Sequence, residues 1–369
     1  MQARLTRSTS LYIDCLRLVA ALIVMLSHVS WNKLSGGFLW PVQPYGHAAV
    51  VVFFVLSGFV IAYTAETKDH DLNQFALSRM SRLYSVILPA LLLTLIADRI
   101  GQAIGPDIYA GESESQPLLR LAAAGLFLSQ SWWSDTTLLS NHSYWSMPYE
   151  FWYYVIFAAA FYLSGWKRYA LSAGAMLIAG PNILLMLPIW LLGVLAYRLS
   201  RRVQMPKLPA AGLFTATLLV MALSEYLADG RGLLTRQYST HYPPGFAAFD
   251  YGLAALLAAN ILASCSLALP FGRWAAVAIK KSAGYSFSIY LYHLPLLYLC
   301  AALLPAAWPV PLRGASMLAM TMVAIVALGS VTENRKEELH RLFARIRVPM
   351  FRLADGRRAA RAAAKSTSS

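Results

Sequence analysis

The sequence predicts an all-α membrane protein that crosses a bilayer about ten times. Apolar residues (AVILMFWYC) make up 58% of the 369 residues, and charged residues make up only 13%. Soluble domains carry about 25% charged residues, so this chain lacks the charge that would cover a soluble globule of its size. Apolar stretches of transmembrane length also recur along the chain. The composition excludes a disordered chain, a collagen-like fibre and a disulfide-stapled miniprotein.

The basic character of the chain supports the membrane assignment. The net charge is +14, which in a soluble protein would suggest a nucleic-acid partner. In a membrane protein, Lys and Arg collect in cytoplasmic loops and beside anionic lipid. With ten spans and a cytoplasmic N-terminus, 24 of the 31 Lys and Arg residues fall on the cytoplasmic side and six on the outer side. We therefore expect both termini in the cytoplasm, membrane lipids as neighbours and no nucleic-acid partner.

Ten stretches of the sequence are candidate spans. The piece at 169–181 is short for a straight crossing, but a thin bilayer or a break at Pro181 accommodates it, and the charge count favours it. Asp14 and Arg17 interrupt the first span, so we expect it to be retained rather than cleaved as a signal peptide. The more polar segment 118–131 is expected to be interfacial or re-entrant. The predicted spans are 12–31, 47–65, 84–104, 148–165, 169–181, 182–199, 208–228, 246–265, 284–304 and 314–332.

The chain is expected to divide into a transmembrane domain, residues 1–332, and a basic cytoplasmic tail, residues 333–369. Apolar residues recur at helical spacing between 339 and 346 among arginines, which predicts an amphipathic helix lying on the inner leaflet. The composition after Asp355 predicts disorder. The cysteines show neither a disulfide framework nor metal-ligand spacing, and we expect no metal; they are Cys15, Cys265 and Cys300.

Ionisable residues inside spans are costly, so they are the natural candidates for a functional site. In the first span, Arg17 and His28 are eleven residues apart, which places them on one helix face about 16 Å apart along the axis. Asp14 lies three residues before Arg17 and is expected to pair with it. The alternative is that Arg17 snorkels inward and His28 lies in the outer interface beside Trp31.

The second and third spans supply a small-residue pair and two arginines. Ser57-Gly58 lets another helix backbone approach closely, and helix packing alone explains it. Arg79 and Arg82 precede the third predicted span and present two guanidinium groups on one face, an arrangement suited to phosphate. Ordinary positive-inside charge explains the two arginines as well.

Two later segments carry further candidates. Ser146 is expected to cap the helix of the fourth span, with Glu150 near the helix N-terminus, where the helix dipole favours an anion. The functional interpretation places Glu150 at the outer mouth, facing the same region as His28. In the ninth long span, His293 precedes Pro295, and its imidazole either serves function or satisfies a carbonyl that the proline leaves free.

Together these segments resemble the bacterial acyltransferase 3 family of transmembrane acyltransferases that modify surface sugars, in the form without a fused periplasmic esterase-like domain. Ala49 and Ser85 depart from the family pattern, where Gly and Pro are usual, and neither is a proposed catalytic group. The motifs that carry the resemblance, in the family's order, are Asp14-x-x-Arg17-x10-His28, Phe53-Phe54-Val-Leu-Ser57-Gly58-Phe59, Arg79-x-x-Arg82-Leu-Tyr, Trp145-Ser-x-x-x-Glu150 and Tyr290-Leu-Tyr-His293.

The resemblance implies transfer of an acyl group, commonly acetyl, from cytoplasmic acyl-CoA to a hydroxyl of an extracytoplasmic glycan, at the bacterial inner membrane. Acyl-CoA is then a donor substrate, and no permanently bound cofactor is expected. We expect the donor phosphates near Arg79 and Arg82 and the pantetheine arm along the face that carries Arg17 and His28. The donor-binding residues are expected to be Arg79, Arg82, Arg17, Ser57 and Gly58.

His28 is the expected general base on the acceptor hydroxyl, because a neutral imidazole suits that task near pH 7. A transient acyl-His28 is the alternative. Glu150 is expected to orient His28 or to bind the sugar, and Arg17 to bind the donor or polarise its thioester carbonyl. The residues expected to bind the acceptor are Trp145, Tyr149, Glu150 and His293.

Two other function classes fit parts of the sequence. A transporter or flippase would also bury Arg, His and Glu, but it is expected to show internal repeats, which the sequence lacks. A sensor or interaction protein would use the basic tail as its output. That class predicts loss of function on truncation after residue 332, whereas an enzyme is expected to keep its activity.

Overall fold

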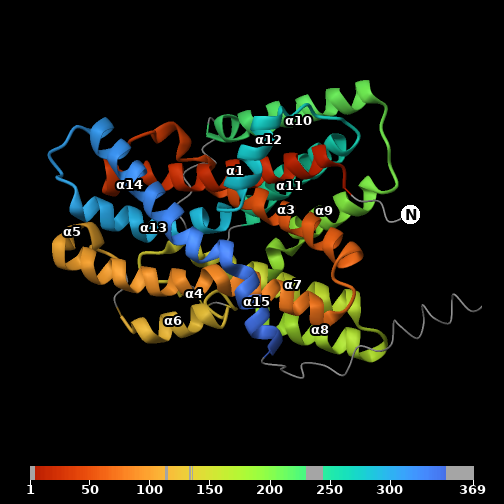
Figure 1. The fold of residues 1–369 in the computed structure, drawn as a ribbon, viewed down its shortest axis with the longest axis horizontal. Coiled ribbons are helices and arrows are strands. Elements are labelled where there is room, and N and C mark those ends of the chain that lie inside the picture. The colour runs from red at the N-terminus through yellow and green to blue at the C-terminus, as the bar shows by residue number, and fades with distance from the viewer. Residues whose placement is uncertain (1–4, 113–114, 133, 135, 230–243, 346–369) are drawn as a thin grey trace, which may run out of the picture.

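The structure is a computed structural model that describes residues 5–112, 115–132, 134, 136–229 and 244–345. These residues form helices joined by loops, and their one β-pairing is an isolated bridge between Leu138 and Asn141. The helices pack into one bundle (Figure 1). The predicted all-α class is therefore confirmed.

A helix occupies each of the ten predicted spans. In the described part of the chain, eight helices are long and apolar enough to cross a membrane, which indicates a multi-pass membrane protein. The other two, α7 and α8, have 17 and 15 residues and are shorter than a usual span. Ten crossings and cytoplasmic termini stay predictions. The ten helices are α1 (Arg7–Val29), α3 (Tyr45–Thr67), α4 (Leu72–Ile104), α7 (Ser146–Tyr162), α8 (Gly165–Ala179), α9 (Pro181–Ser200), α10 (Lys207–Asp229), α11 (Pro244–Cys265), α13 (Ser286–Leu303) and α14 (Val310–Val331).

Helix α4 begins twelve residues before the predicted start of the third span. The side chain of Asp71 accepts a hydrogen bond from the backbone N–H of Gln74 and caps the helix N-terminus. The helix then continues without a break to Ile104, so Arg79 and Arg82 lie inside α4 rather than before it. The two arginines still precede residue 84, where the predicted third span begins.

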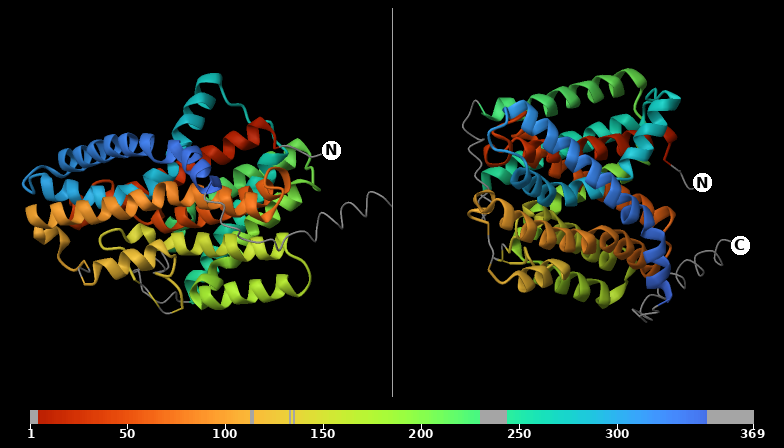
Figure 2. Two further views of the ribbon diagram at one scale, coloured as in Figure 1. Left: turned by 60° about the horizontal axis from the view of Figure 1, so that its bottom comes forward. Right: turned by 60° about the vertical axis from the view of Figure 1, so that its left-hand side comes forward.

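Short helices complete the chain. The segment predicted as interfacial or re-entrant contains a nine-residue helix, α6, whose Leu118 and Leu119 are exposed. The amphipathic helix predicted in the tail is present as α15, and it packs against α4, with the ring of Phe343 6.4 Å from that of Tyr84 (Figure 2). Disorder predicted after Asp355 falls outside the described residues. The short helices are α2 (Asn32–Ser35), η1 (Trp40–Val42), α5 (Pro106–Tyr109), α6 (Pro117–Gly125), η2 (His142–Trp145), α12 (Arg273–Ala283), η3 (Glu333–Arg335) and α15 (Lys336–Arg345).

Helices α3 and α9 lie in backbone contact. A Cβ atom at Gly58 would overlap the carbonyl oxygen of Trp190, and a Cβ at Gly193 would overlap that of Val55. Each helix therefore needs a glycine at the crossing. Small residues commonly allow this close approach between helices in membranes. The sequence interpretation of Ser57-Gly58 as a close-packing pair is confirmed.

We call the end of the bundle where α1 starts, at Arg7, the proximal end, and the end where α1 stops, at Val29, the distal end. The loop before α7 runs inward from the distal end and is tied to its neighbours by buried polar groups. Asp98 on α4 accepts hydrogen bonds from the backbone N–H and the hydroxyl of Ser140, at 3.0 and 2.5 Å. The amide of Asn141 donates to Thr94 and to the backbone carbonyl of Leu291 on α13. These bonds let α7 begin inside the bundle.

Replacing Gly58 by Ala should destabilise the protein, because the new methyl group meets backbone that cannot move aside without separating α3 from α9. The loss in free energy of unfolding should be at least about 1–3 kcal/mol, which is typical of core overpacking. Thermal unfolding of purified protein in detergent measures it. Gly174→Ala is the matched control, since a Cβ there meets nothing within 4 Å. Equal melting temperatures for the two variants would contradict the packing argument.

Candidate active site

Five helices surround a cavity in the bundle. It is lined by Arg17 on α1, Ser57 on α3, Arg82 on α4, Glu150 on α7 and Tyr290 on α13, together with apolar side chains. Its volume of about 60 Å³ holds a few water molecules and no larger ligand without opening. The other lining residues are Ile13, Phe53, Phe54, Leu56, Val60, Ile61, Arg79, Ser146, Met147, Tyr154, Ser286 and Phe287.

Glu150 is held in place by neighbouring hydroxyl groups. Its carboxylate accepts hydrogen bonds from Ser57, at 3.1 Å, and from Tyr154 one turn later on α7. The indole N–H of Trp190 donates to Ser57 in turn, at 3.1 Å. The chain Trp190–Ser57–Glu150 therefore links α9, α3 and α7 at the cavity wall.

Ser146 does not cap α7 as predicted. The helix starts at Ser146 itself, and the residue at the cap position, Trp145, provides no side-chain hydrogen bond. The hydroxyl of Ser146 instead pairs with that of Tyr290 on α13, at 2.7 Å. Burial of the α7 N-terminus inside the bundle gives Ser146 a tertiary partner in place of the local one.

The three arginines of the cavity differ in how far their charge is neutralised. Arg17 pairs with Asp14 at 2.7 Å, as predicted, and Arg79 pairs with Asp69 at 2.8 Å. The Nε atoms of Arg17 and Arg79 are nevertheless buried without a hydrogen-bond partner among the described residues. The guanidinium of Arg82 forms no hydrogen bond or ion pair with any described residue. The cavity therefore keeps unused N–H groups and a positive charge, which together suit an anion.

His28 lies outside this cavity, in the last turn of α1 at the distal end. It is 7% exposed, and its Nδ1 lies 2.8 Å from the carbonyl oxygen of Val24 and 3.0 Å from Nε2 of His293, which is fully buried. The ring of Trp31 lies edge-on to His28, at 4.7 Å between centroids. By helix rise, about 16 Å separate His28 from Arg17 along α1.

The structure thus distributes the predicted site residues over several places. Glu150 bonds with Ser57 and Tyr154, and among the described residues its hydrogen bonds do not include His28. Gly58 faces α9 and is not part of the cavity lining. Trp145 and Tyr149 pack on each other and on Phe54, with Tyr149 4% exposed.

The family model described as an acyltransferase domain, of acyltransferase 3 type, matches residues 10–330. The chain belongs to the acyltransferase 3 family. This match covers nearly the whole bundle, with both the cavity and the histidine pair inside it. It favours an enzyme over the transporter and sensor alternatives.

Two relatives agree with the assignment of the chain to this family. An O-acetyl transferase of Shigella phage Sf6 is 24% identical over 299 residues, which are 76% of this chain and 83% of the relative. Acyltransferase MdmB of Streptomyces mycarofaciens is 32% identical over 164 residues, 42% of this chain and 40% of the relative. No solved structure matches the chain. Family and relatives support a membrane O-acyltransferase.

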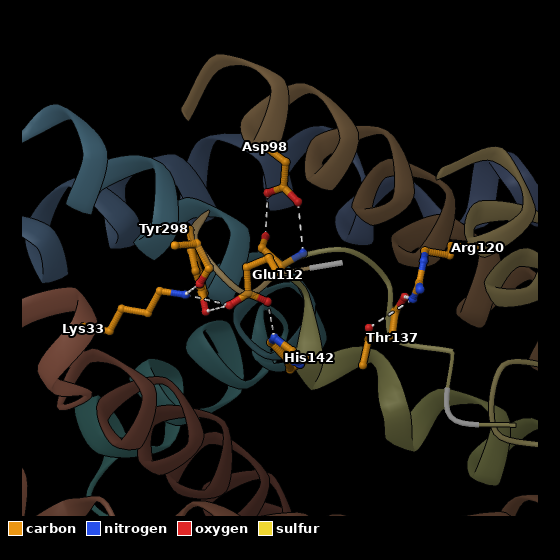
Figure 3. Close-up of polar contacts among 9 residues, drawn as sticks. Lys33, Asp98, Glu112, Arg120, Thr137, His142 and Tyr298 are labelled. Atoms are coloured by element: carbon orange, nitrogen blue, oxygen red, sulfur yellow. Dashed lines mark hydrogen bonds and ion pairs between the residues drawn. The ribbon is translucent and has the colours of Figure 1, made fainter. Parts of the chain in front are cut away.

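At the distal end, the acyltransferase carries a polar cluster around Glu112 (Figure 3). The carboxylate accepts hydrogen bonds from Lys33 at 2.9 Å, Tyr298 at 2.7 Å and His142 at 2.6 Å. Burial alone would raise the pKa of Glu112, but His142, with Tyr298 and Lys33, lowers it to about 2. His142 also lies beside Trp31, so the cluster adjoins His28.

Sequence reasoning missed Glu112, His142 and Asp98. The signal for Asp98 was available, because it is an ionisable residue inside the third predicted span. Glu112 lies in a loop and His142 in the short helix η2, outside the predicted spans, where charged residues are ordinary. Only tertiary contact brings Lys33, His142 and Tyr298 around one carboxylate.

The Glu112 cluster predicts a pH-dependent contribution to stability. Because the pKa of Glu112 in the folded protein is about 2, below its ordinary value of 4.5, the ionised carboxylate stabilises the fold above pH 4.5. That stabilisation is lost as the pH falls toward 2. Melting temperatures in detergent should show wild type above Glu112→Gln at pH 7, with a smaller gap at pH 3. Asp107→Asn, at an exposed position of α5, is the control, and a gap independent of pH would contradict the assignment.

Proposed function

We propose that this protein moves an acyl group, acetyl above all, from acyl-CoA at the proximal end to a hydroxyl of a glycan at the distal end. One observation carries the proposal: an arginine-lined cavity and a histidine pair share helix α1, about 16 Å apart along its axis. A negatively charged donor and a neutral acceptor would then meet the protein at different levels. The proximal end would face the cytoplasm of a bacterial inner membrane.

The cavity is the proposed entrance for the donor. The guanidinium of Arg82 has no hydrogen-bond or ion-pair partner in the described part of the chain, and Arg17 and Arg79 each keep an unused Nε–H group. These donors suit the phosphates or the thioester carbonyl of acyl-CoA, whose pantetheine arm would extend along α1 toward His28. We assign Glu150 to this donor side, with Ser57, instead of to the orientation of His28.

Transfer requires one proton acceptor at the acceptor hydroxyl, and His28 is the proposed one. Its imidazole takes the hydroxyl proton as the hydroxyl oxygen bonds to the acyl carbon. The carbon–sulfur bond then breaks, and the imidazolium returns the proton to the leaving thiolate, so CoA departs as a thiol. An acyl-His28 intermediate, in which the imidazole attacks the thioester first, is the alternative route.

The acceptor would approach from the distal end. Trp31 covers one edge of His28 and lies 6.4 Å from the ring of His142, whose side chain is 38% exposed. Such aromatic faces suit the apolar face of a sugar ring, and nearby hydrogen-bonding groups suit its hydroxyls. The named activity of the phage relative, O-acetyl transfer, supports an oxygen acceptor.

Arg82→Ala should weaken acetyl-CoA binding about tenfold to a hundredfold, because one charge-assisted hydrogen bond is worth about 1.5–3 kcal/mol. Calorimetry on purified protein in detergent measures the affinity. Arg99→Ala is the matched control, since Arg99 is an exposed arginine near the other end of the same helix. Equal weakening in both variants, or none in either, would overturn the donor site.

His28→Ala should reduce acetyl transfer by at least about a hundredfold, in keeping with loss of a general base. Acetyl-CoA binding should stay close to that of wild type, because His28 lies outside the cavity. The measurement is CoA thiol release that depends on added glycan, with the melting temperature as a check on folding. Near-normal transfer by a folded variant would refute the role of His28.

A further inference from the structure

We infer that His293 is a positioning residue, which holds His28 with its proton on Nδ1 and its Nε2 presented to the acceptor hydroxyl. The inference rests on the proposed function, because it assigns His28 the base. It changes the expected role of His293 from acceptor binding to support of His28. The observation that carries it is the contact between the two imidazoles from α1 and α13.

The tautomer of His28 follows from its first partner. Nδ1 lies 2.8 Å from the backbone carbonyl oxygen of Val24. A carbonyl oxygen can only accept, so Nδ1 must carry a hydrogen. In the neutral ring, Nε2 then holds the lone pair, and it makes no hydrogen bond to a described residue. Nε2 is therefore the atom of His28 that can take a proton.

The same reasoning fixes His293. Its Nδ1 lies 2.8 Å from the carbonyl oxygen of Ile289 and must donate, so the lone pair of the neutral ring is on Nε2. This Nε2 lies 3.0 Å from Nδ1 of His28 and 3.3 Å from the hydroxyl of Ser143. His293 therefore accepts from the N–H of His28, and both rings are oriented along their own helices.

This arrangement supports His28 as it gains a proton. When Nε2 takes the acceptor's proton, the imidazolium still donates from Nδ1 toward Val24 and His293. The two rings are 7% and 0% exposed, so water cannot readily replace that acceptor. A group that fixes tautomer and orientation is the usual companion of a histidine base.

His293 is not needed to satisfy the backbone carbonyl that Pro295 leaves free in α13. Pro295 lacks an N–H, so the carbonyl left without its helical partner is that of Leu291, four residues earlier. The amide of Asn141 already donates to this carbonyl, at 2.9 Å. His293 is therefore not needed to satisfy the break in α13, and its side chain points to His28 instead.

The test compares three substitutions at His293. Gln places an acceptor oxygen close to the position of Nε2, Asn has the same amide one carbon shorter, and Leu has no acceptor. We expect His293→Gln to keep within about threefold of wild-type kcat, and His293→Asn and His293→Leu to lose about ten- to a hundredfold, the usual cost of losing such support. The KM for acetyl-CoA should be unchanged in all three.

Each result decides a separate question. If wild type transfers acetyl and His28→Ala does not, but Gln and Leu at His293 lose kcat equally with normal melting temperatures, the positioning role is wrong. Full activity of folded His293→Leu also overturns it. Failure of the proposed function has a different signature: wild type that transfers no acetyl group, or His28→Ala that stays active.

Discussion

The arrangement of the cavity and of the histidine pair depends on the hydrogen bonds between the buried carboxylate of Asp98 and Ser140. Because it accepts hydrogen bonds from the backbone N–H and the hydroxyl of Ser140, this carboxylate holds the loop before α7 inside the bundle. Three residues of η2 then reach different neighbours: His142 bonds with Glu112, Ser143 bonds with His293, and Trp145 packs on Phe54. Helix α7 starts directly afterwards, which places Glu150 in the cavity wall.

The two sites are connected through α1 and α13. Helix α1 carries Arg17 in the cavity and His28 at the distal end, while α13 carries Tyr290 in the cavity and His293 beside His28. The rings of Tyr290 and His293 lie 6.5 Å apart. Two packed helices therefore hold the arginine-lined cavity and the buried histidine pair in fixed relation.

The features that could be predicted from the sequence were those set by residues close to one another along the chain. Apolar runs located the ten helices, and spacing along one helix located the pair Asp14–Arg17 and the common face of Arg17 and His28. Contacts between residues far apart in the sequence were out of reach, since nothing local marks His28 and His293 as partners across 265 positions. Gly58 shows the same limit: its small size indicated close packing, but only the tertiary structure shows that it faces α9 and not the cavity.

The small volume of the cavity has a consequence for kinetics. The proposed donor, acyl-CoA, would enter only after helices move apart, and α3 cannot easily leave α9, because their backbones touch at two glycines. The segment after α14 is hydrogen-bonded to α13: the carboxylate of Glu333 accepts from the backbone N–H and the hydroxyl of Ser288, and the hydroxyl of Tyr292 donates to that of Thr332. In the proposed reaction, association with acyl-CoA would be limited by such a motion, and it would proceed more slowly than the attraction between arginines and phosphates alone would allow.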